Sequence, residues 1–565
     1  MTDQNRGTSR RGVLKLAGAA GVVAIYPGRR VFASADKSYD FAVEAGRIVV
    51  DSVESNAIRM GGSVPAPTLR WREGEEVVIH ATNKLREPTS IHWHGLLLEG
   101  VMDGAPGFNG FVAIHPGETY TYRFKLRQAG TYWYHSHSSA QEQAGMYGAI
   151  VIEPKGREPV RADRDYVVVL SDHTQEHPMR VLRNLKADAG YYNRGKRTLI
   201  DFFRDAGRDG FAATLKDRLE WGAMRMDPTD LADVTGYAFL VNGRGPKDNW
   251  TAIFDPGQRV RLRFINASAM SFYDVRIPGL PMTVVSADGQ NVQPVRVDEF
   301  RIGVAETYDV IVLPREDKAY TIFAEPIDRS GHARASLAPR AGMEGPIPEQ
   351  RPRTILSMAD MGMAHGGMDH SAMTPGGGSM AGMDHSKMAM PGMDHGAMAQ
   401  GAAADPAGKR AFGWADAATP PGAKALSYAD LIAATKNPDA RAPSQEIELR
   451  LTGIMDRYIW NLNGRPFGRE EPIRVAYGDR VRIKFVNETM MAHPMHLHGM
   501  FVELENGQTD RKPLKHVVIV PPGQTASAVL TADEPGDWPF HCHLVYHMAA
   551  GMMTRFIVEK KTASL

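Results

Sequence analysis

The sequence contains a single cysteine, Cys542, among 565 residues. One cysteine cannot form an intramolecular disulfide, so Cys542 must be a buried thiol, a nucleophile or a metal ligand. Strong charge of either sign is absent too, because 66 Lys and Arg nearly balance 65 Asp and Glu. This balance provides no overall field for nucleic acid or an anionic membrane, and it favours a small neutral or cationic substrate.

Long apolar segments are also missing. After the N-terminal region there is no run of 18 or more apolar residues, so we expect no stable membrane anchor. The N-terminus instead resembles an export signal, because the pair Arg10-Arg11 precedes a modest apolar stretch at 16–26 and a small-residue cleavage pattern at 33–35. We therefore expect residues 1–35 to be a twin-arginine signal peptide of a periplasmic protein, with a basic tail as the alternative.

Short strands separated by Pro-Gly and Asp-Gly turns dominate the chain, which is typical of β-sandwiches. Before the last strands the composition changes to Gly, Ala, Pro and Met, with too little bulky apolar surface for a folded core. The sequence thus predicts an all-β protein of three sandwich domains, with a helical insertion in the second and a Met-rich flexible linker before the third. The expected bounds are 36–160 for the first domain, 161–340 for the second with its insertion at 184–231, 341–443 for the linker and 444–565 for the third.

Ten of the twenty histidines and the only cysteine fall in four short motifs. These are His92-Trp93-His94-Gly95, His135-Ser136-His137, His493-Pro494-Met495-His496-Leu497-His498-Gly499, and His541-Cys542-His543 continuing to His547 and Met552. Every motif contains His-X-His, and residues i and i+2 of a strand project to one face of its sheet. Each pair can therefore present two imidazoles to one metal cluster.

The cysteine motif can serve two metal sites. Strand alternation places His541 and His543 on one face and Cys542 on the other. One thiolate, two imidazoles and a weak axial Met make the blue-copper electron-transfer site. The candidate ligands of that site are Cys542, His547, Met552 and the distant His493.

Plainer interpretations compete with a copper site. Zinc also binds His and Cys, but the eleven ligands of the motifs exceed one tetrahedral zinc site. Isolated histidines are usually solvent-exposed or hydrogen-bonded in a core. We expect this of His80, His115, His173, His177, His332 and His516.

The four motifs, in this order, resemble those of the multicopper oxidases, the family of laccases, ascorbate oxidase and bacterial cuprous oxidases. The resemblance covers nearly the whole mature chain and implies cupredoxin-like domains with four copper ions. It assigns His493, Cys542, His547 and Met552 to a type 1 copper, His92 and His496 to a type 2 copper, and His94, His135, His137, His498, His541 and His543 to a binuclear type 3 pair.

The resemblance also implies the reaction. Electrons enter singly at the type 1 copper and pass through Cys542 to its flanking histidines, and four of them reduce dioxygen to water. Asp103 matches, by its Asp-Gly context, an acidic residue near the type 2 copper in family members, and a plain β-turn residue is the alternative. Met548 stands where some relatives carry an acidic residue, which leaves the proton path on that side open.

Methionine is abundant, with 29 residues, and a tract at 357–400 holds three Met-Asp-His repeats. Thioethers suit Cu(I), whereas His and Asp can hold Cu(II). This tract, the twin-arginine start and the segments 221–228 and 490–494 resemble the bacterial copper-resistance protein A group. That resemblance implies a periplasmic oxidase of Cu(I), with extra copper on the Met-rich segment and periplasmic copper carriers as partners. A passive linker is the alternative for the tract.

Other functions remain open. A laccase-like oxidase of phenols or other organic donors would have an open apolar pocket near His493. A copper-sequestering protein would need neither Cys542 nor a trinuclear cluster, and a copper nitrite reductase is disfavoured by the complete type 3 set. Thr489 stands where some cuprous oxidases carry an acidic residue, so no docking residue for Cu(I) is assigned from the sequence.

Overall fold

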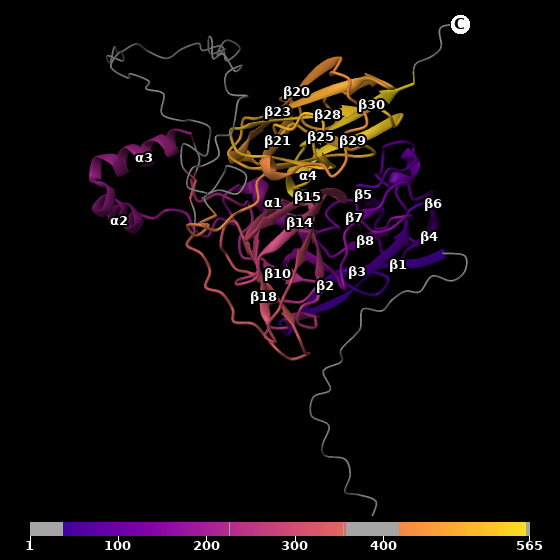
Figure 1. Ribbon diagram of the computed structural model, residues 1–565. Coiled ribbons are helices and arrows are strands. Elements are labelled where there is room, and N and C mark those ends of the chain that lie inside the picture. The colour runs from indigo at the N-terminus through magenta and orange to yellow at the C-terminus, as the bar shows by residue number, and fades with distance from the viewer. Residues whose placement is uncertain (1–37, 225–226, 354, 357–416, 561–565) are drawn as a thin grey trace, which may run out of the picture.

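The computed structural model in Figure 1 describes residues 38–224, 227–353, 355–356 and 417–560. The expected signal peptide and the Met-Asp-His repeats lie outside the described residues, as does most of the expected linker. Regular structure is mostly β, in three two-sheet units, which confirms the predicted fold class. Within the described ranges, no helix combines the length and the apolar character that crossing a membrane requires.

The first unit consists of two four-stranded sheets around one core. One sheet has the strand order β2 (Val53–Met60), β1 (Ser38–Val50), β4 (Glu76–Asn83) and β6 (Thr119–Lys125). The other has the order β3 (Ala66–Arg72), β8 (Tyr147–Glu153), β7 (Gly130–His135) and β5 (His92–His94). Alternate residues of β4, such as Val77 and Ile79, point inward and pack in the same cluster as Trp71 and Trp93.

The second unit consists of a six-stranded and a five-stranded sheet. The first has the order β10 (Ala238–Val241), β9 (Arg164–His173), β12 (Val260–Asn266), β17 (Thr307–Val312), β14 (Met282–Ala287) and β15 (Gln290–Val297). The second has the order β11 (Trp250–Ile253), β19 (Ala333–Ala338), β18 (Tyr320–Pro326), β13 (Tyr273–Arg276) and β16 (Glu299–Ile302). Strand β12 is buried along its whole length, because it lies inside its sheet with both faces covered.

The third unit repeats this plan. Its six-stranded sheet has the order β21 (Ile459–Leu462), β20 (Gln445–Ile454), β23 (Arg480–Asn487), β28 (Thr525–Thr531), β25 (Val502–Leu504) and β26 (Leu514–Lys515). Its five-stranded sheet has the order β22 (Ile473–Ala476), β30 (Met553–Glu559), β29 (Gly536–Cys542), β24 (His493–Leu497) and β27 (Val517–Val520). A short helix, α4 (Val545–Ala549), connects β29 to β30.

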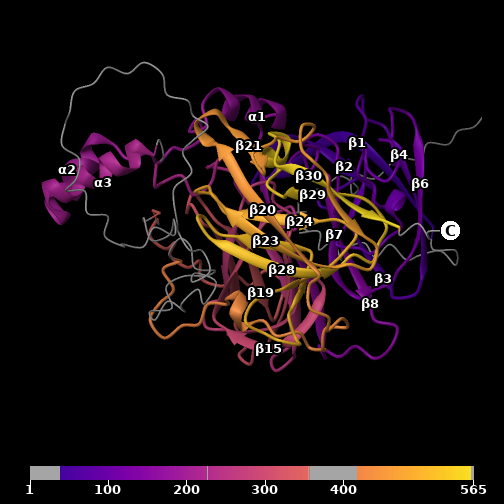
Figure 2. The same cartoon turned by 90° about the horizontal axis from the view of Figure 1, so that it is seen from above.

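Three helices follow β9: α1 (Pro178–Ala187), α2 (Leu199–Asp209) and α3 (Phe211–Ala223). They begin before the expected start at residue 184, because Pro178 occupies a first helical turn, where proline is favourable, and the His177 ring accepts a hydrogen bond from the Met179 amide. Thr198 forms a capping box at the start of α2. Figures 1 and 2 both show α2 and α3 projecting away from the β units.

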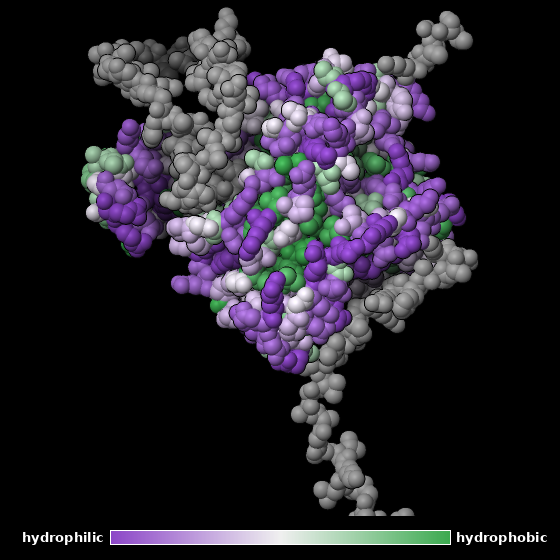
Figure 3. Space-filling model, in the orientation of Figure 1, coloured by the Kyte–Doolittle hydropathy of each residue, from purple (hydrophilic) through white to green (hydrophobic). Residues whose placement is uncertain are grey.

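Burial divides the molecule into two apolar clusters. One fills the first unit, and the other runs continuously through the second and third units. The face drawn in Figure 3 is largely hydrophilic around a strip of hydrophobic residues. The second and third units therefore share a core, and the first unit contributes its histidine-bearing sheet edge to the junction described next.

Candidate metal centres

Two antiparallel strand pairs bring the four motifs together. Strand β5 pairs with β7 in the first unit, so that His92 lies opposite His135. Strand β24 pairs with β29 in the third unit, so that His496 lies opposite His541. The two pairs meet where the units join, because the His92 and His498 rings stack at 3.9 Å between centroids.

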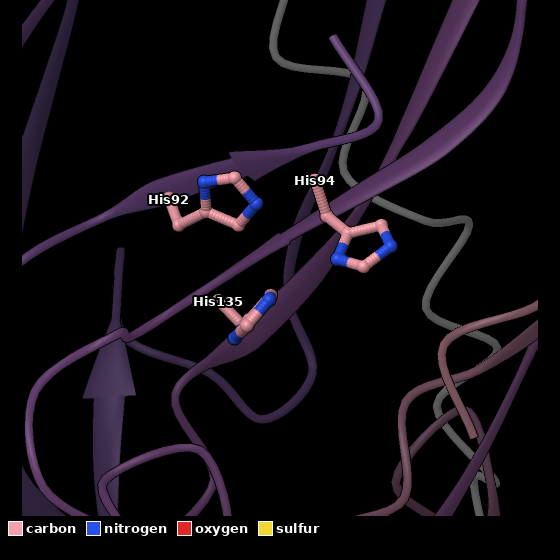
Figure 4. Close-up of side chains that lie close together, drawn as sticks. All are labelled: His92, His94 and His135. Atoms are coloured by element: carbon pink, nitrogen blue, oxygen red, sulfur yellow. The ribbon is translucent and has the colours of Figure 1, made fainter. Parts of the chain in front are cut away.

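Eight predicted histidines form one cluster at this junction. Figure 4 shows three of them, His92, His94 and His135, with their rings gathered around a common space. Seven of the eight are buried and His137 is partly buried. The members are His92, His94, His135, His137, His496, His498, His541 and His543.

Hydrogen bonds fix the proton on one nitrogen of several of these rings. His92 Nδ1–H donates to the Asp103 carbonyl at 2.9 Å, and His496 Nδ1–H donates to the His516 carbonyl at 2.7 Å. Because a neutral imidazole carries one proton, Nε2 of each ring keeps a free lone pair. Both Nε2 atoms are buried with no hydrogen-bond partner in the described chain. This arrangement is how metal-ligating histidines are usually held.

Two of the lone pairs face each other directly. His498 Nδ1–H donates to Asp103 Oδ2 at 2.8 Å, and His541 Nδ1–H donates to its neighbour's carbonyl at 2.9 Å. The two Nε2 atoms then lie 3.1 Å apart with no proton between them. Burial, and secondarily the neighbouring imidazoles, lower the pKa of His498 well below its usual range, so a proton is disfavoured there. A metal cation satisfies both lone pairs, and the donor set fits copper.

Asp103 lies beside two histidines of the cluster. It ends a 3-10 turn (η1, Gly100–Asp103), and Gly104 follows with φ of 80°. Its buried carboxylate also lies 3.3 Å from His92 Nδ1, in addition to the hydrogen bond from His498. Asp103 is therefore both a turn residue and a polar partner of two site histidines.

Glu142 is a second buried carboxyl at the cluster, and no sequence motif singled it out. His135 Nδ1–H donates to Glu142 Oε2 at 2.6 Å. Burial, and secondarily Asp172, raise the pKa of Glu142 well above its usual range. It lies five residues after His137, and that spacing alone gave no reason to select it.

The remaining predicted ligands form a second, separate site around the buried thiol. Cys542 Sγ lies 3.5 Å from His493 Nδ1 and 3.7 Å from His547 Nδ1, and the two Nδ1 atoms are 3.2 Å apart. Backbone hydrogen bonds place Met552 beside them, because its amide donates to the His547 carbonyl and its carbonyl accepts from the Cys542 amide. Trp460 stacks on the His547 ring at 3.8 Å and shields the group from water.

Tautomers are fixed at this second site as well. Thr489 Oγ1 donates to Asn487 Oδ1, so it accepts the 2.7 Å hydrogen bond from His493 Nε2–H. His547 Nε2–H donates to Asp233 Oδ2 at 2.7 Å. Both Nδ1 lone pairs therefore face the thiol. Burial raises the pKa of Cys542, so the thiolate form requires a bound cation, which a coordinating metal provides.

Several residues of this site were missed by sequence reasoning. Asp233 comes from the second unit, 314 residues before His547. Thr489 is buried, and its hydroxyl orients His493. At the histidine cluster, His516, expected to be solvent-exposed or hydrogen-bonded in a core, is buried against His94, with 3.1 Å between His516 Nδ1 and His94 Nε2.

A cavity of about 310 Å³ opens beside the thiol site. Its walls come from the helical insertion of the second unit and from the loops around β21 and β24. The lining residues are Asp188, Ala189, Gly190, Asn193, Lys196, Asp227, Asp230, Met455, Asp456 and Met490. Burial raises the pKa of Asp230 well above its usual range, with further contributions from Asp233 and Asp227, and Asp230 Oδ1 finds no hydrogen-bond partner among the described residues. The cavity is therefore suited to a cation.

Comparison with known proteins identifies the family of this arrangement. Three family models described as Multicopper oxidase match residues 42–157, 164–341 and 440–562. Copper resistance protein A of Escherichia coli is 45% identical over 98% of this chain and 99% of its own length. The Copper resistance protein A homolog of Pseudomonas syringae pv. tomato is 47% identical over 92% of each chain.

Solved structures share the fold at lower identity. Fet3p, a multicopper oxidase that functions in iron import, matches with a TM-score of 0.64 and 18% identity, over 93% of this chain and 90% of its own. The laccase from Botrytis aclada matches with a TM-score of 0.64 and 20% identity, over 93% and 88% of the two chains. The three β units are therefore cupredoxin-like domains.

Proposed function

The chain belongs to the multicopper oxidase family, and on this premise we propose that it is a periplasmic copper-resistance oxidase that oxidises Cu(I) to Cu(II) and reduces dioxygen to water. Its relatives named Copper resistance protein A support this assignment over nearly the whole chain. The export route is proposed to be the twin-arginine pathway, with residues 1–35 as its signal.

We assign the ligands of four copper ions from the two clusters. When bound, copper supplies one-electron transfer at the thiol site and the reduction of dioxygen at the histidine cluster. The proposed type 1 ligands are His493, Cys542, His547 and Met552. The proposed type 2 ligands are His92 and His496, and the proposed type 3 ligands are His94, His135, His137, His498, His541 and His543.

The protein's own residues prepare both sites. Trp460 and the surrounding core exclude water from the thiol site. His541 and His543 flank Cys542 in the chain, so a short covalent path joins the two sites. Asp103 holds a proton on Nδ1 of His498, which leaves Nε2 of that ring to bind metal. Met548 has no titratable proton. Asp103 and Glu142 are buried carboxyl groups in contact with cluster histidines, and they can transfer protons there.

The cavity beside the thiol site is the observation that favours Cu(I) as the donor. Its lining includes four carboxyl groups, two thioethers and the ammonium group of Lys196, so acidic groups outnumber basic ones, and the carboxyl and thioether groups suit copper in both oxidation states. The laccase alternative predicted an open apolar pocket near His493 instead. Asp233 lies close enough to Asp230 to contribute to the raised pKa of Asp230, and Asp233 accepts a hydrogen bond from His547. A cation in this cavity is thus adjacent to the proposed type 1 site.

Oxygen uptake by the copper-loaded protein tests the proposed function. We expect kcat/KM for Cu(I) to exceed that for a phenolic donor by at least about tenfold, which corresponds to ~1.4 kcal/mol in transition-state stabilisation. The reverse preference would establish a laccase. No oxygen uptake with either donor would leave copper sequestration as the function of the protein.

A single substitution tests whether the cavity serves the donor. We expect Asp230→Asn to raise KM for Cu(I) by about tenfold, or ~1.4 kcal/mol, because it removes a carboxyl group that ionises when a cation binds, while keeping the side-chain shape. Turnover of the phenolic donor should change little. Glu220→Gln, an equal charge change on α3 outside the cavity lining, is the matched control. Equal losses with both donors would show that Asp230 supports the fold rather than the donor.

The Met-Asp-His tract is proposed to bind extra copper and to accept it from periplasmic carriers. Its thioether and imidazole groups suit Cu(I) and Cu(II) respectively. Deleting residues 357–400 should lower the copper bound beyond the four resident ions and slow Cu(I) turnover at low donor concentration, while phenol oxidation stays constant. Copper analysis and oxygen uptake measure the two effects. Unchanged kinetics and copper content would make the tract a passive linker.

A further inference from the structure

His516 contacts two proposed copper ligands at once. Its ring Nδ1 lies 3.1 Å from His94 Nε2, and its carbonyl accepts a 2.7 Å hydrogen bond from His496 Nδ1–H. The two ligands belong to different motifs, one in the first domain and one in the third. The His516 side chain is buried, with only 1% of it exposed.

The proton of the first contact can be placed. His94 Nδ1 is buried and has no hydrogen-bond partner in the described part of the chain, so it is the nitrogen available to a metal. The ring proton of His94 then sits on Nε2, and Nε2–H donates to His516 Nδ1. His516 therefore acts on both ligands as an acceptor, through its ring for His94 and through its backbone for His496.

Surrounding residues are arranged to hold His516 in this place. The His516 ring lies against Gly95, where an added Cβ would be 2.5 Å from the ring Cδ2. The glycine of the first motif is thus required for this contact, besides having a φ of 81°. Asp288 of the second domain accepts hydrogen bonds from the His516 and Val517 amides at 3.2 and 3.1 Å. All three domains therefore meet at this residue.

We propose that His516 is a positioning residue of the histidine cluster, which orients His94 and His496 for copper and ties the cluster to the second domain. This role rests on the proposed copper ligands. It gives the second domain, which supplies none of the proposed ligands, a direct connection to the dioxygen-reducing site. His516 lies outside the four His-X-His motifs, so the sequence did not indicate this role.

Three substitutions separate the ring acceptor from the volume of the side chain. Asn places its amide oxygen where Nδ1 lies in histidine, whereas Gln places its amide near the position of Nε2. Leu removes the acceptor altogether and retains similar bulk. The backbone contacts to His496 and Asp288 persist in all three variants, so a difference among them reports on the hydrogen bond from His94.

We expect His516→Gln and His516→Leu to weaken type 2 and type 3 copper binding by about 10- to 100-fold, as loss of such a supporting contact usually does, and His516→Asn to retain most of it. Chelator competition, the electron paramagnetic resonance of type 2 copper and the near-ultraviolet absorption of the type 3 pair measure the loss. The blue absorption of the thiol site should stay unchanged in all variants, which verifies folding.

Equal copper retention in the Asn and Gln variants, or full retention in the Leu variant, would overturn the proposed role. The unsubstituted protein keeps the two proposals apart. If it lacks the type 2 and type 3 signals itself, the assigned ligand set is wrong, whatever the variants do. If it has them and the variants do not differ, the ligand set stands and the role of His516 fails.

Discussion

We expect the Cys542→Ser variant to lose the blue thiolate-to-copper absorption and at least ~1000-fold of its Cu(I)-driven oxygen uptake, which corresponds to ~4 kcal/mol. Serine keeps the shape of the side chain but replaces the soft thiolate with a hydroxyl, which is a poor copper ligand. The pair His493 and His547 would then bind copper weakly, without the covalent route through Cys542 to the histidine cluster. Oxygen consumption and visible absorption measure the two losses.

The histidine cluster provides the internal control for this variant. None of its eight members is replaced, and the His541 hydrogen bond goes to the backbone carbonyl of residue 542, which serine retains. Type 2 and type 3 signals should therefore persist, and copper content should fall by one ion per chain. Uptake that continued at the original rate would mean that electrons reach the cluster without the thiol site.

The sequence predicted the ligand groups because strand periodicity is local. His92 and His94 lie on one strand, whereas His137, His498 and His543 follow the ends of β7, β24 and β29, and the pairing of β5 with β7 and of β24 with β29 gathers the motifs. The fold class followed from the turn-rich strands in the same way. The helical insertion starts at Pro178, six residues before the expected residue 184, and proline is favourable in a first helical turn.

Residues that support the ligands could not be predicted in this way. Asp233 meets His547 across 314 residues, and His516 meets His94 across 422. Each is an isolated polar residue in its own segment, and only the packing of one domain on another gives it a partner. Glu142 and Thr489 lie near ligands in the chain, but no periodic pattern distinguishes their buried carboxyl and hydroxyl from ordinary surface groups.

The loss of Lys515 should strongly destabilise the fold. Its ammonium group lies 2.8 Å from Glu306 and 3.1 Å from Asp288, and all three side chains are fully buried between the second and third domains. Burial is the largest single influence on the pKa of Lys515 and lowers it. Coulombic attraction from Asp288 and Glu306 outweighs burial, so the pKa is raised. We expect Lys515→Met to lower the free energy of unfolding by about 3–5 kcal/mol, because it leaves buried carboxylates without a cation.

Denaturant unfolding of the copper-free protein measures this loss, and copper-free samples keep metal binding out of the result. Lys436→Met is the matched control, because Lys436 forms an exposed pair with Asp510 and its loss should leave the unfolding midpoint nearly unchanged. The triple variant Lys515→Met, Asp288→Asn, Glu306→Gln should recover much of the stability by removing the uncompensated charges. If Lys515→Met alone unfolds like the control, the buried ion pairs contribute nothing net. A loss that the triple variant does not recover would assign it to packing of the lysine stem instead.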